Sequence, residues 1–150
     1  MVLRPGEAVT WRWGHVEPVK YHGSNKPKYP DLICNGLWEY RPDFSRELWR
    51  HGVAAVEGVR ASGGELTAEE GKAGTVVWKL ASPYIFVGGR LEAEGAGARF
   101  SLSWDGKSWE PVGQDLDKFF PPNGPARYEY KLRCELGADA HLKRLAIVND

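Results

Sequence analysis

The sequence has no excess of charge of either sign, because its 20 basic residues match its 20 acidic residues. A chain that binds nucleic acid ordinarily carries a patch or stripe of lysine and arginine that neutralises phosphates. No part of this sequence concentrates basic residues in that way. We therefore expect no nucleic acid among its partners.

Long hydrophobic runs are also missing. No apolar stretch approaches the roughly 18 residues that a membrane-spanning helix needs. No leader of charged, then apolar, then small residues follows Met1. We expect no membrane span and no signal peptide within this sequence.

Cysteine is scarce, since Cys34 and Cys134 are the two in the chain and lie far apart. No C-x-x-C motif is present, which excludes a zinc ribbon and a thioredoxin-type redox site. A disulfide between the two, if the protein is exported, and two buried free thiols are both open. At 150 residues the chain can bury a core without such a crosslink.

Aromatic residues are abundant, with seven tryptophans, six tyrosines and five phenylalanines. Many of them alternate with polar residues at a period of two, which is typical of strands with one buried face. No β-α-β rhythm is present, so the strands should form antiparallel sheets. The strands expected on this pattern are 8–13, 53–60, 75–80, 84–94, 99–104, 128–136 and 142–148.

The predicted fold class is therefore an all-β, antiparallel β-sandwich of about eight or nine strands in a single domain that spans the chain. The periodicity fails over 14–50, which carries prolines and scattered aromatics. We expect this stretch to be a long irregular segment that caps an open end or carries function. Within it, 43–50 predicts at most one short helix, with Phe44 and Leu48 on its inner side and Trp49 as a further candidate for that side.

The sharpest local signal is the sequence Ser-Trp-Asp-Gly-Lys-Ser-Trp at 103–109. Asp-Gly favours a two-residue type I′ turn between antiparallel strands. In that register Leu102 faces Trp109 on an apolar face. Trp104 then lies at the rim of the sandwich beside Lys107.

Several segments together resemble the galactose-binding-like jelly rolls, which include discoidin-type domains and carbohydrate-binding modules. They are Ser82–Phe86, Phe100–Trp104, the hairpin at 103–109 and the closing strand at 142–148. The resemblance covers roughly residues 75–150.

The resemblance implies a jelly-roll sandwich that binds a poly- or oligosaccharide without catalysis. It also implies an accessory domain of a polysaccharide-degrading enzyme, excised from or continuing into a larger multidomain protein. Such a domain would be extracellular or periplasmic and monomeric as an isolated module. In the similar domains the aromatic that matches Trp109 packs in the core, so we expect the same of Trp109.

Sugar recognition needs flat aromatic faces flanked by polar groups that bind hydroxyls. Candidates are aromatics that strand alternation does not send into the core. They are Trp104 with Asp105 at the turn, and Trp38, Tyr40 and Trp49 in the irregular segment with Arg46 and Arg50. A loop aromatic that plugs the end of the sandwich is the alternative for each. Core packing is expected for strand aromatics, among them Trp78, Tyr84, Tyr128 and Tyr130. A binding site on a concave face is the alternative for Tyr128 and Tyr130, since their hydroxyls need partners if buried.

The best oxygen-rich loop contains Asp115 and Asp117. Calcium prefers hard oxygen ligands of this kind, and jelly rolls of the resembled group often hold a structural calcium. A calcium site at these two residues is therefore a candidate.

Two other functions are open beside glycan binding. The first is a structural spacer sandwich that docks on a neighbouring catalytic domain through 14–50. The second is a small glycan-active hydrolase, which would need two opposed carboxylates. Glu92 and Glu94 are neighbours on one strand face and are most simply a solvent-facing pair, so we expect no enzyme.

Overall fold

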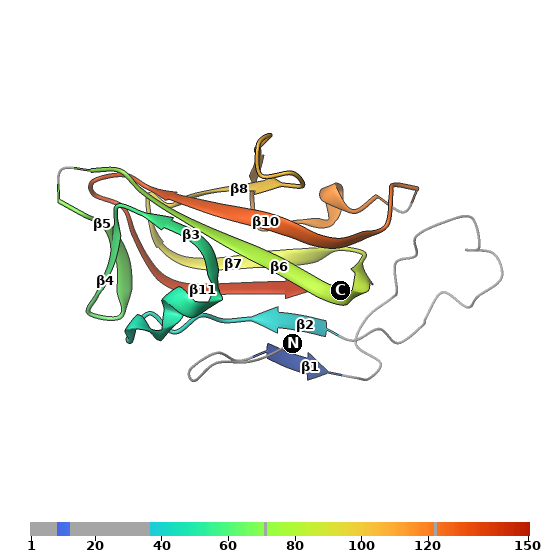
Figure 1. Ribbon diagram of the computed structural model, residues 1–150, viewed down its shortest axis with the longest axis horizontal. Helices are drawn as coiled ribbons and strands as arrows, with labels where there is room; N and C mark the ends of the chain where they lie inside the picture. The colour runs from blue at the N-terminus through green and yellow to red at the C-terminus, as the bar shows by residue number, and fades with distance from the viewer. Residues whose placement is uncertain (1–8, 13–36, 71, 122) are drawn as a thin grey trace.

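The computed structural model places eleven β-strands in two antiparallel sheets (Figure 1). It describes residues 9–12, 37–70, 72–121 and 123–150, and the statements below concern these residues. The antiparallel β-sandwich predicted from the sequence is confirmed, although the described strands outnumber the eight or nine expected. None of the helices in the described part is long and apolar enough to cross a membrane.

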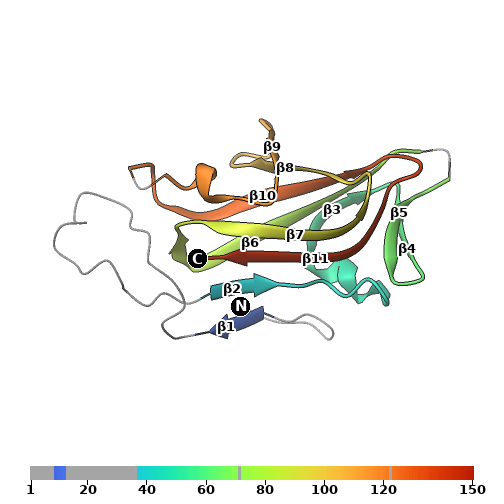
Figure 2. The same cartoon turned by 180° about the vertical axis from the view of Figure 1, so that it is seen from behind.

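Sheet A is organised around the last strand, β11 (His141–Asn149). One edge of β11 pairs along its length with β7 (Gly89–Ala96), as Figure 2 shows from behind. The other edge pairs first with β5 (Glu65–Ala68) and then with β2 (Leu37–Tyr40). Two further strands flank these, namely β4 (Val59–Ser62) beside β5 and β1 (Val9–Arg12) beside β2.

Sheet B has the strand order β3-β6-β10-β8-β9. Its members are β3 (Val53–Glu57), β6 (Gly74–Phe86), β10 (Arg127–Leu136), β8 (Arg99–Ser103) and β9 (Glu110–Val112). Two short 3-10 helices, η2 (Glu47–Gly52) and η3 (Asp117–Phe119), lie in the connections.

The core lies between the two sheets. In β10 the alternation predicted from the sequence is confirmed, since Tyr130, Leu132, Cys134 and Leu136 are at most 1% exposed. Burying a large apolar side chain contributes about 1.5–3 kcal/mol. The largest sealed side chains come from both sheets and the loop after η3: Trp78, Tyr130, Phe86, Phe120, Leu66, Leu80, Leu102, Leu132, Leu142 and Ile147.

A glycine divides the expected strand 53–60 in two. Gly58 has a φ of 59°, in the left-handed region. The chain turns there from β3 in sheet B to β4 in sheet A, so the prediction of one continuous strand was wrong. Gly63 and Gly64, with φ of 63° and 83°, form the turn that joins β4 to β5.

The irregular segment was also predicted too broadly. Residues 37–40 form β2, which pairs with β11 through Tyr40 and Ile147. The helical turn expected at 43–50 corresponds to η2, and Phe44 and Trp49 are buried as predicted. Residues 13–36 lie outside the described part.

The structure describes one of the two cysteines. Cys134 is a free, fully buried thiol. Cys34 lies outside the described residues.

Candidate functional site

The loop between β8 and β9 is built around the carboxylate of Asp105. Its Oδ1 accepts hydrogen bonds from the amides of Lys107 (2.7 Å) and Ser108 (2.9 Å) and from the hydroxyl of Ser103 (3.0 Å). The Ser103 hydroxyl in turn accepts the amide of Gly106 at 2.7 Å. The amides of Ser108 and then Lys107 hold the pKa of Asp105 near 2, because they stabilise the charged form.

These hydrogen bonds widen the turn, so the predicted two-residue type I′ turn was wrong. That turn needs positive φ at both central residues, and among the described residues only glycines have it. The ladder pairs Leu102 with Glu110 and Phe100 with Val112, one residue away from the predicted register. A slip of one residue moves side chains to the opposite face of the sheet.

Trp109 is the side chain that this slip relocates. It lies on the outer face of sheet B, the face turned away from sheet A, where the Arg133 guanidinium sits 4.4 Å from its ring centroid. Arg133 also donates to the Ser101 hydroxyl at 3.1 Å. The expectation that Trp109 packs in the core was therefore wrong, and the ring is a partly buried surface aromatic.

Trp104 takes the inward position instead. Its ring makes edge contacts with Phe120 (5.5 Å) and Tyr130 (6.3 Å), and the Arg127 guanidinium lies 4.3 Å from it. Trp104 is thus a plug at the end of the sandwich, partly buried against the core. It does not stand free at the rim as predicted.

The three other aromatic candidates are inside the protein. Trp38, Tyr40 and Trp49 are 6%, 9% and 2% exposed, so none of them has the open ring that a glycan-binding candidate needs, and packing inside the protein, the alternative stated for each, is what the structure has. Residues 38 and 40 share the inward face of β2, and the Trp38 ring packs 6.1 Å from that of Phe86. A sealed ring offers no face for a sugar to stack on.

Arg46, just before η2, and Arg50, within it, are exposed. The η2 segment lies at the opposite side of the molecule from the β8–β9 loop (Figure 1). Arg50 binds Glu47 at 2.6 Å and the carbonyl of Val59 at 3.3 Å, and it covers the Trp49 ring. The structure therefore does not bring the predicted ligand-binding residues into one site.

Asp115 and Asp117 bind backbone amides. Asp117 Oδ1 accepts the amide of Gly89 at 3.0 Å, and Asp115 Oδ1 accepts the amide of Asp117 at 2.8 Å. These contacts hold the loop against β7, beside a hollow of about 570 Å³. In the described parts of the chain no group of three or more histidine, cysteine, aspartate or glutamate residues could hold a metal ion.

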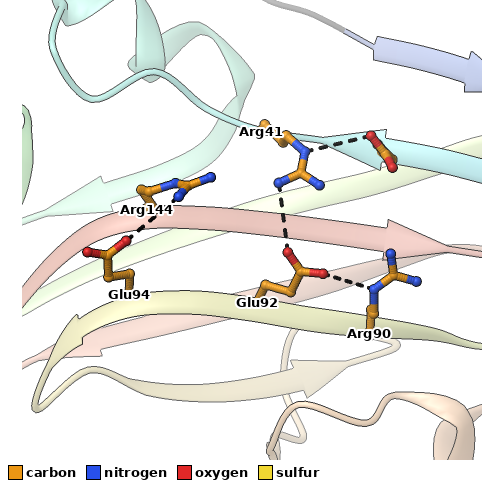
Figure 3. A network of polar contacts seen from close by, with 6 residues as sticks. Arg41, Arg90, Glu92, Glu94 and Arg144 are labelled. Carbon is orange, nitrogen blue, oxygen red and sulfur yellow. Dashed lines mark hydrogen bonds and ion pairs between the residues drawn. The ribbon is translucent and has the colours of Figure 1, made fainter.

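The acidic pair of β7 is solvent-facing, as predicted, and each member has an arginine partner (Figure 3). Glu92 lies 2.9 Å from Arg90 and 3.8 Å from Arg41, and Glu94 lies 3.9 Å from Arg144. The hydrogen bond from Arg90 lowers the pKa of Glu92. This face is an ion-pair ladder across β2, β11 and β7.

The sequence favoured core packing for two aromatics that are exposed in the described part of the chain. Tyr84 and Tyr128 are 57% and 50% exposed and are the exposed large hydrophobic side chains of the described residues, although core packing was expected. The ladder pairs Arg127 with Phe86 but Glu129 with Ala81, so 82–85 bulges opposite Tyr128 alone.

The bulge has a sequence signal that could have been used. Pro83 cannot donate a ladder hydrogen bond, and the amide of Tyr84 binds the Ser82 hydroxyl at 3.0 Å instead. Tyr130 lies beyond the bulge and is sealed, with its hydroxyl donating to Asn149 Oδ1 at 2.9 Å. Burial raises the pKa of Tyr130.

Comparison with protein-family models, curated proteins and solved structures finds no match.

Proposed function

We propose that the chain is a non-catalytic carbohydrate-binding module whose glycan lies beside Tyr84 and Tyr128, at the end of sheet B where β6 bulges opposite β10. The observation that carries the proposal is the pair of half-exposed tyrosines on adjacent strands at one end of the sheet. Large aromatic rings held open to water are the platforms on which the apolar face of a sugar stacks. The resemblance of residues 75–150 to galactose-binding-like modules, described from the sequence, is a further reason for this proposal.

Polar groups flank the tyrosines on the same two strands. Lys79 and Glu129 form an ion pair of 2.9 Å and are each about half exposed. Such groups bind sugar hydroxyls with charge-assisted hydrogen bonds. Farther along β10, the stacked pair of Arg133 and Trp109 extends the surface.

The module would act by equilibrium binding. Holding a polysaccharide raises its effective concentration for a catalytic domain on the same chain. We place such a protein outside the cytoplasm, in the extracellular space or the periplasm, where polysaccharides are degraded.

The docking alternative receives less support. The described part of its expected docking surface, 37–50, buries Trp38, Tyr40, Phe44 and Trp49 in the chain's own core. A docking face would leave a contiguous apolar patch when unoccupied.

Tyr84→Ala and Tyr128→Ala test the proposal. Each variant should weaken polysaccharide binding by about 1 kcal/mol, roughly fivefold, because a stacking ring is lost. The measurement is affinity electrophoresis in galactan, xylan, β-glucan and polygalacturonate, with calcium and with a chelator. The thermal unfolding midpoint should stay unchanged, because both rings are outside the core.

Tyr84→Phe and Tyr128→Phe are the matched controls, since they keep the ring and remove only the hydroxyl. They should bind like the unmodified protein or nearly so. Equal migration of the alanine variants and the unmodified protein in every gel would overturn the proposed function.

A further inference from the structure

The outer face of sheet B carries a row of charged residues on its central strand. Outward positions of β10 alternate with the buried ones and are Glu129, Lys131, Arg133 and Glu135. Lys131 lies directly opposite Lys79 of β6 in the ladder, and opposite Ser103 of β8 on its other side. Like charges placed opposite each other repel.

The neighbouring cations have carboxylate partners, but Lys131 does not. Lys79 binds Glu129 at 2.9 Å, and Arg133 lies 3.7 Å from Glu135. Among the described residues no carboxylate oxygen comes within 4.0 Å of the Lys131 ammonium. The side chain is nevertheless partly buried.

The Lys131 ammonium lies against the loop between β8 and β9. A Cβ atom built on Gly106 would lie 2.4 Å from Lys131 Nζ, so the side chain rests against the loop backbone. The carboxylate of this loop, Asp105, is engaged by Ser103, Lys107 and Ser108. Lys131, which has no carboxylate partner among the described residues, thus lies beside a second cation, Lys79. The next outward residue of β10 is Arg133, whose guanidinium lies over the Trp109 ring.

We propose, building on the proposed function, that this face selects glycans that carry an anionic group, a uronate carboxylate or a sulfate ester, which binds at Lys131. An anion there would complete the charge balance of the Lys79 and Lys131 pair. Lys131 and Tyr128 are three positions apart on β10, roughly 10 Å along the strand. Positions three apart on a regular strand point to opposite faces, so a glycan that contacts both must pass around this end of the sheet, where β6 bulges opposite Tyr128.

The test compares polymers that differ only in charge. Polygalacturonic acid is paired with the same polymer after reduction of its carboxylates to alcohols, and dextran sulfate is paired with dextran. Dissociation constants are measured by calorimetry at low and at high sodium chloride concentration. At least one anionic polymer should bind roughly tenfold more tightly than its neutral partner, and the preference should shrink with salt.

Lys131→Gln should abolish most of that preference and leave binding of the neutral partner unchanged. Lys143→Gln is the matched control, since it removes the same charge from β11 of sheet A, where Lys143 lies 3.6 Å from Glu65. The control should keep the full preference. Thermal unfolding of Lys131→Gln should occur at the same or a higher temperature, because the repulsion with Lys79 is removed.

Three outcomes would overturn the inference. They are equal affinity for the charged and neutral polymers, equal loss in the Lys131 and Lys143 variants, and equally tight binding of single-stranded DNA, which would indicate unselective attraction of polyanions. Neutral polymers bound through Tyr84 and Tyr128 without any preference would leave the proposed function standing. A preference for anionic polymers that depends on Lys131, with binding unchanged in both tyrosine variants, would instead overturn the proposed function and keep the anion site.

Discussion

A single carboxylate decides the shape of the β8–β9 loop. Asp105 binds two amides and one hydroxyl through Oδ1. A two-residue turn would leave no place for these contacts, so the side chain overrides the backbone preference of Asp-Gly. This residue is the reason that Trp104 and Trp109 exchanged the roles predicted for them.

The pKa of Asp105 makes this contact dependent on pH. The pKa is lowered from 3.8 to about 2 in the folded chain, chiefly by the amides of Ser108 and Lys107. Its contribution to stability is therefore complete above the unfolded-state pKa near 3.8 and is lost as the pH falls through about 2.

Asp105→Ala should destabilise the protein by a constant amount above pH 4, and the difference from the unmodified protein should shrink between about pH 4 and pH 2. Urea unfolding of both proteins at a series of pH values measures it. Asp139→Ala, at an exposed position in the turn before β11, is the control. A difference that does not change with pH would contradict the role assigned to the charged form of Asp105.

At the scale of elements, the corner at Gly58, where the chain passes from one sheet to the other, was harder to predict than the strands. β10 was predicted nearly to its ends because its alternation reflects one buried and one solvated face. β3 and β4 were merged, because small apolar residues on both sides of Gly58 give no sign that the chain changes sheets. β5 was missed because it is only four residues long, and its two apolar residues, Leu66 and Ala68, are too few to reveal an alternation.

Gly58→Ala should test how much the corner contributes to folding. The residue has a φ of 59°, and an added Cβ would lie 2.7 Å from the carbonyl oxygen of Ala73. We expect a loss of about 2 kcal/mol or more in the free energy of unfolding, from the left-handed backbone and the close contact.

Gly63→Ala is the matched comparison for the corner. Its φ is 63°, but nothing lies within 4 Å of the added Cβ. Its loss should be about 1 kcal/mol, from the backbone alone. Equal losses in the two variants, measured by urea unfolding, would show that the contact at Ala73 contributes nothing.

At the scale of the whole molecule, many of the buried aromatic rings in the described part of the chain form one connected cluster. Ring contacts run from Tyr40 through Trp38 and Phe86 to Tyr130 and then Trp104, so they join the two sheets. This network absorbs most of the rings that were expected to bind ligand. Among the described residues, the surface includes the two tyrosines at the bulge and the partly buried Trp109.

The thiol of Cys134 reports on the integrity of this core. It is fully buried, and burial, with a smaller effect of Glu135, raises its pKa to about 12. In a Cys34→Ala variant, alkylation of Cys134 should be negligible in buffer and should rise with urea in step with global unfolding, because the thiolate is the reactive form. Rapid labelling without denaturant, followed by mass spectrometry, would contradict a sealed core.

The sequence by itself determined the all-β class, the antiparallel sheets and the inward face of β10, because each follows from local alternation and from the absence of helix periodicity. Only the tertiary structure decided which aromatics face water. That outcome depends on the register of one hairpin, on a bulge opposite Tyr128 and on the pairing of β2 with β11. All three arise from contacts between residues distant in sequence or from side chains that compete with the backbone, and a pattern of single residues does not contain them.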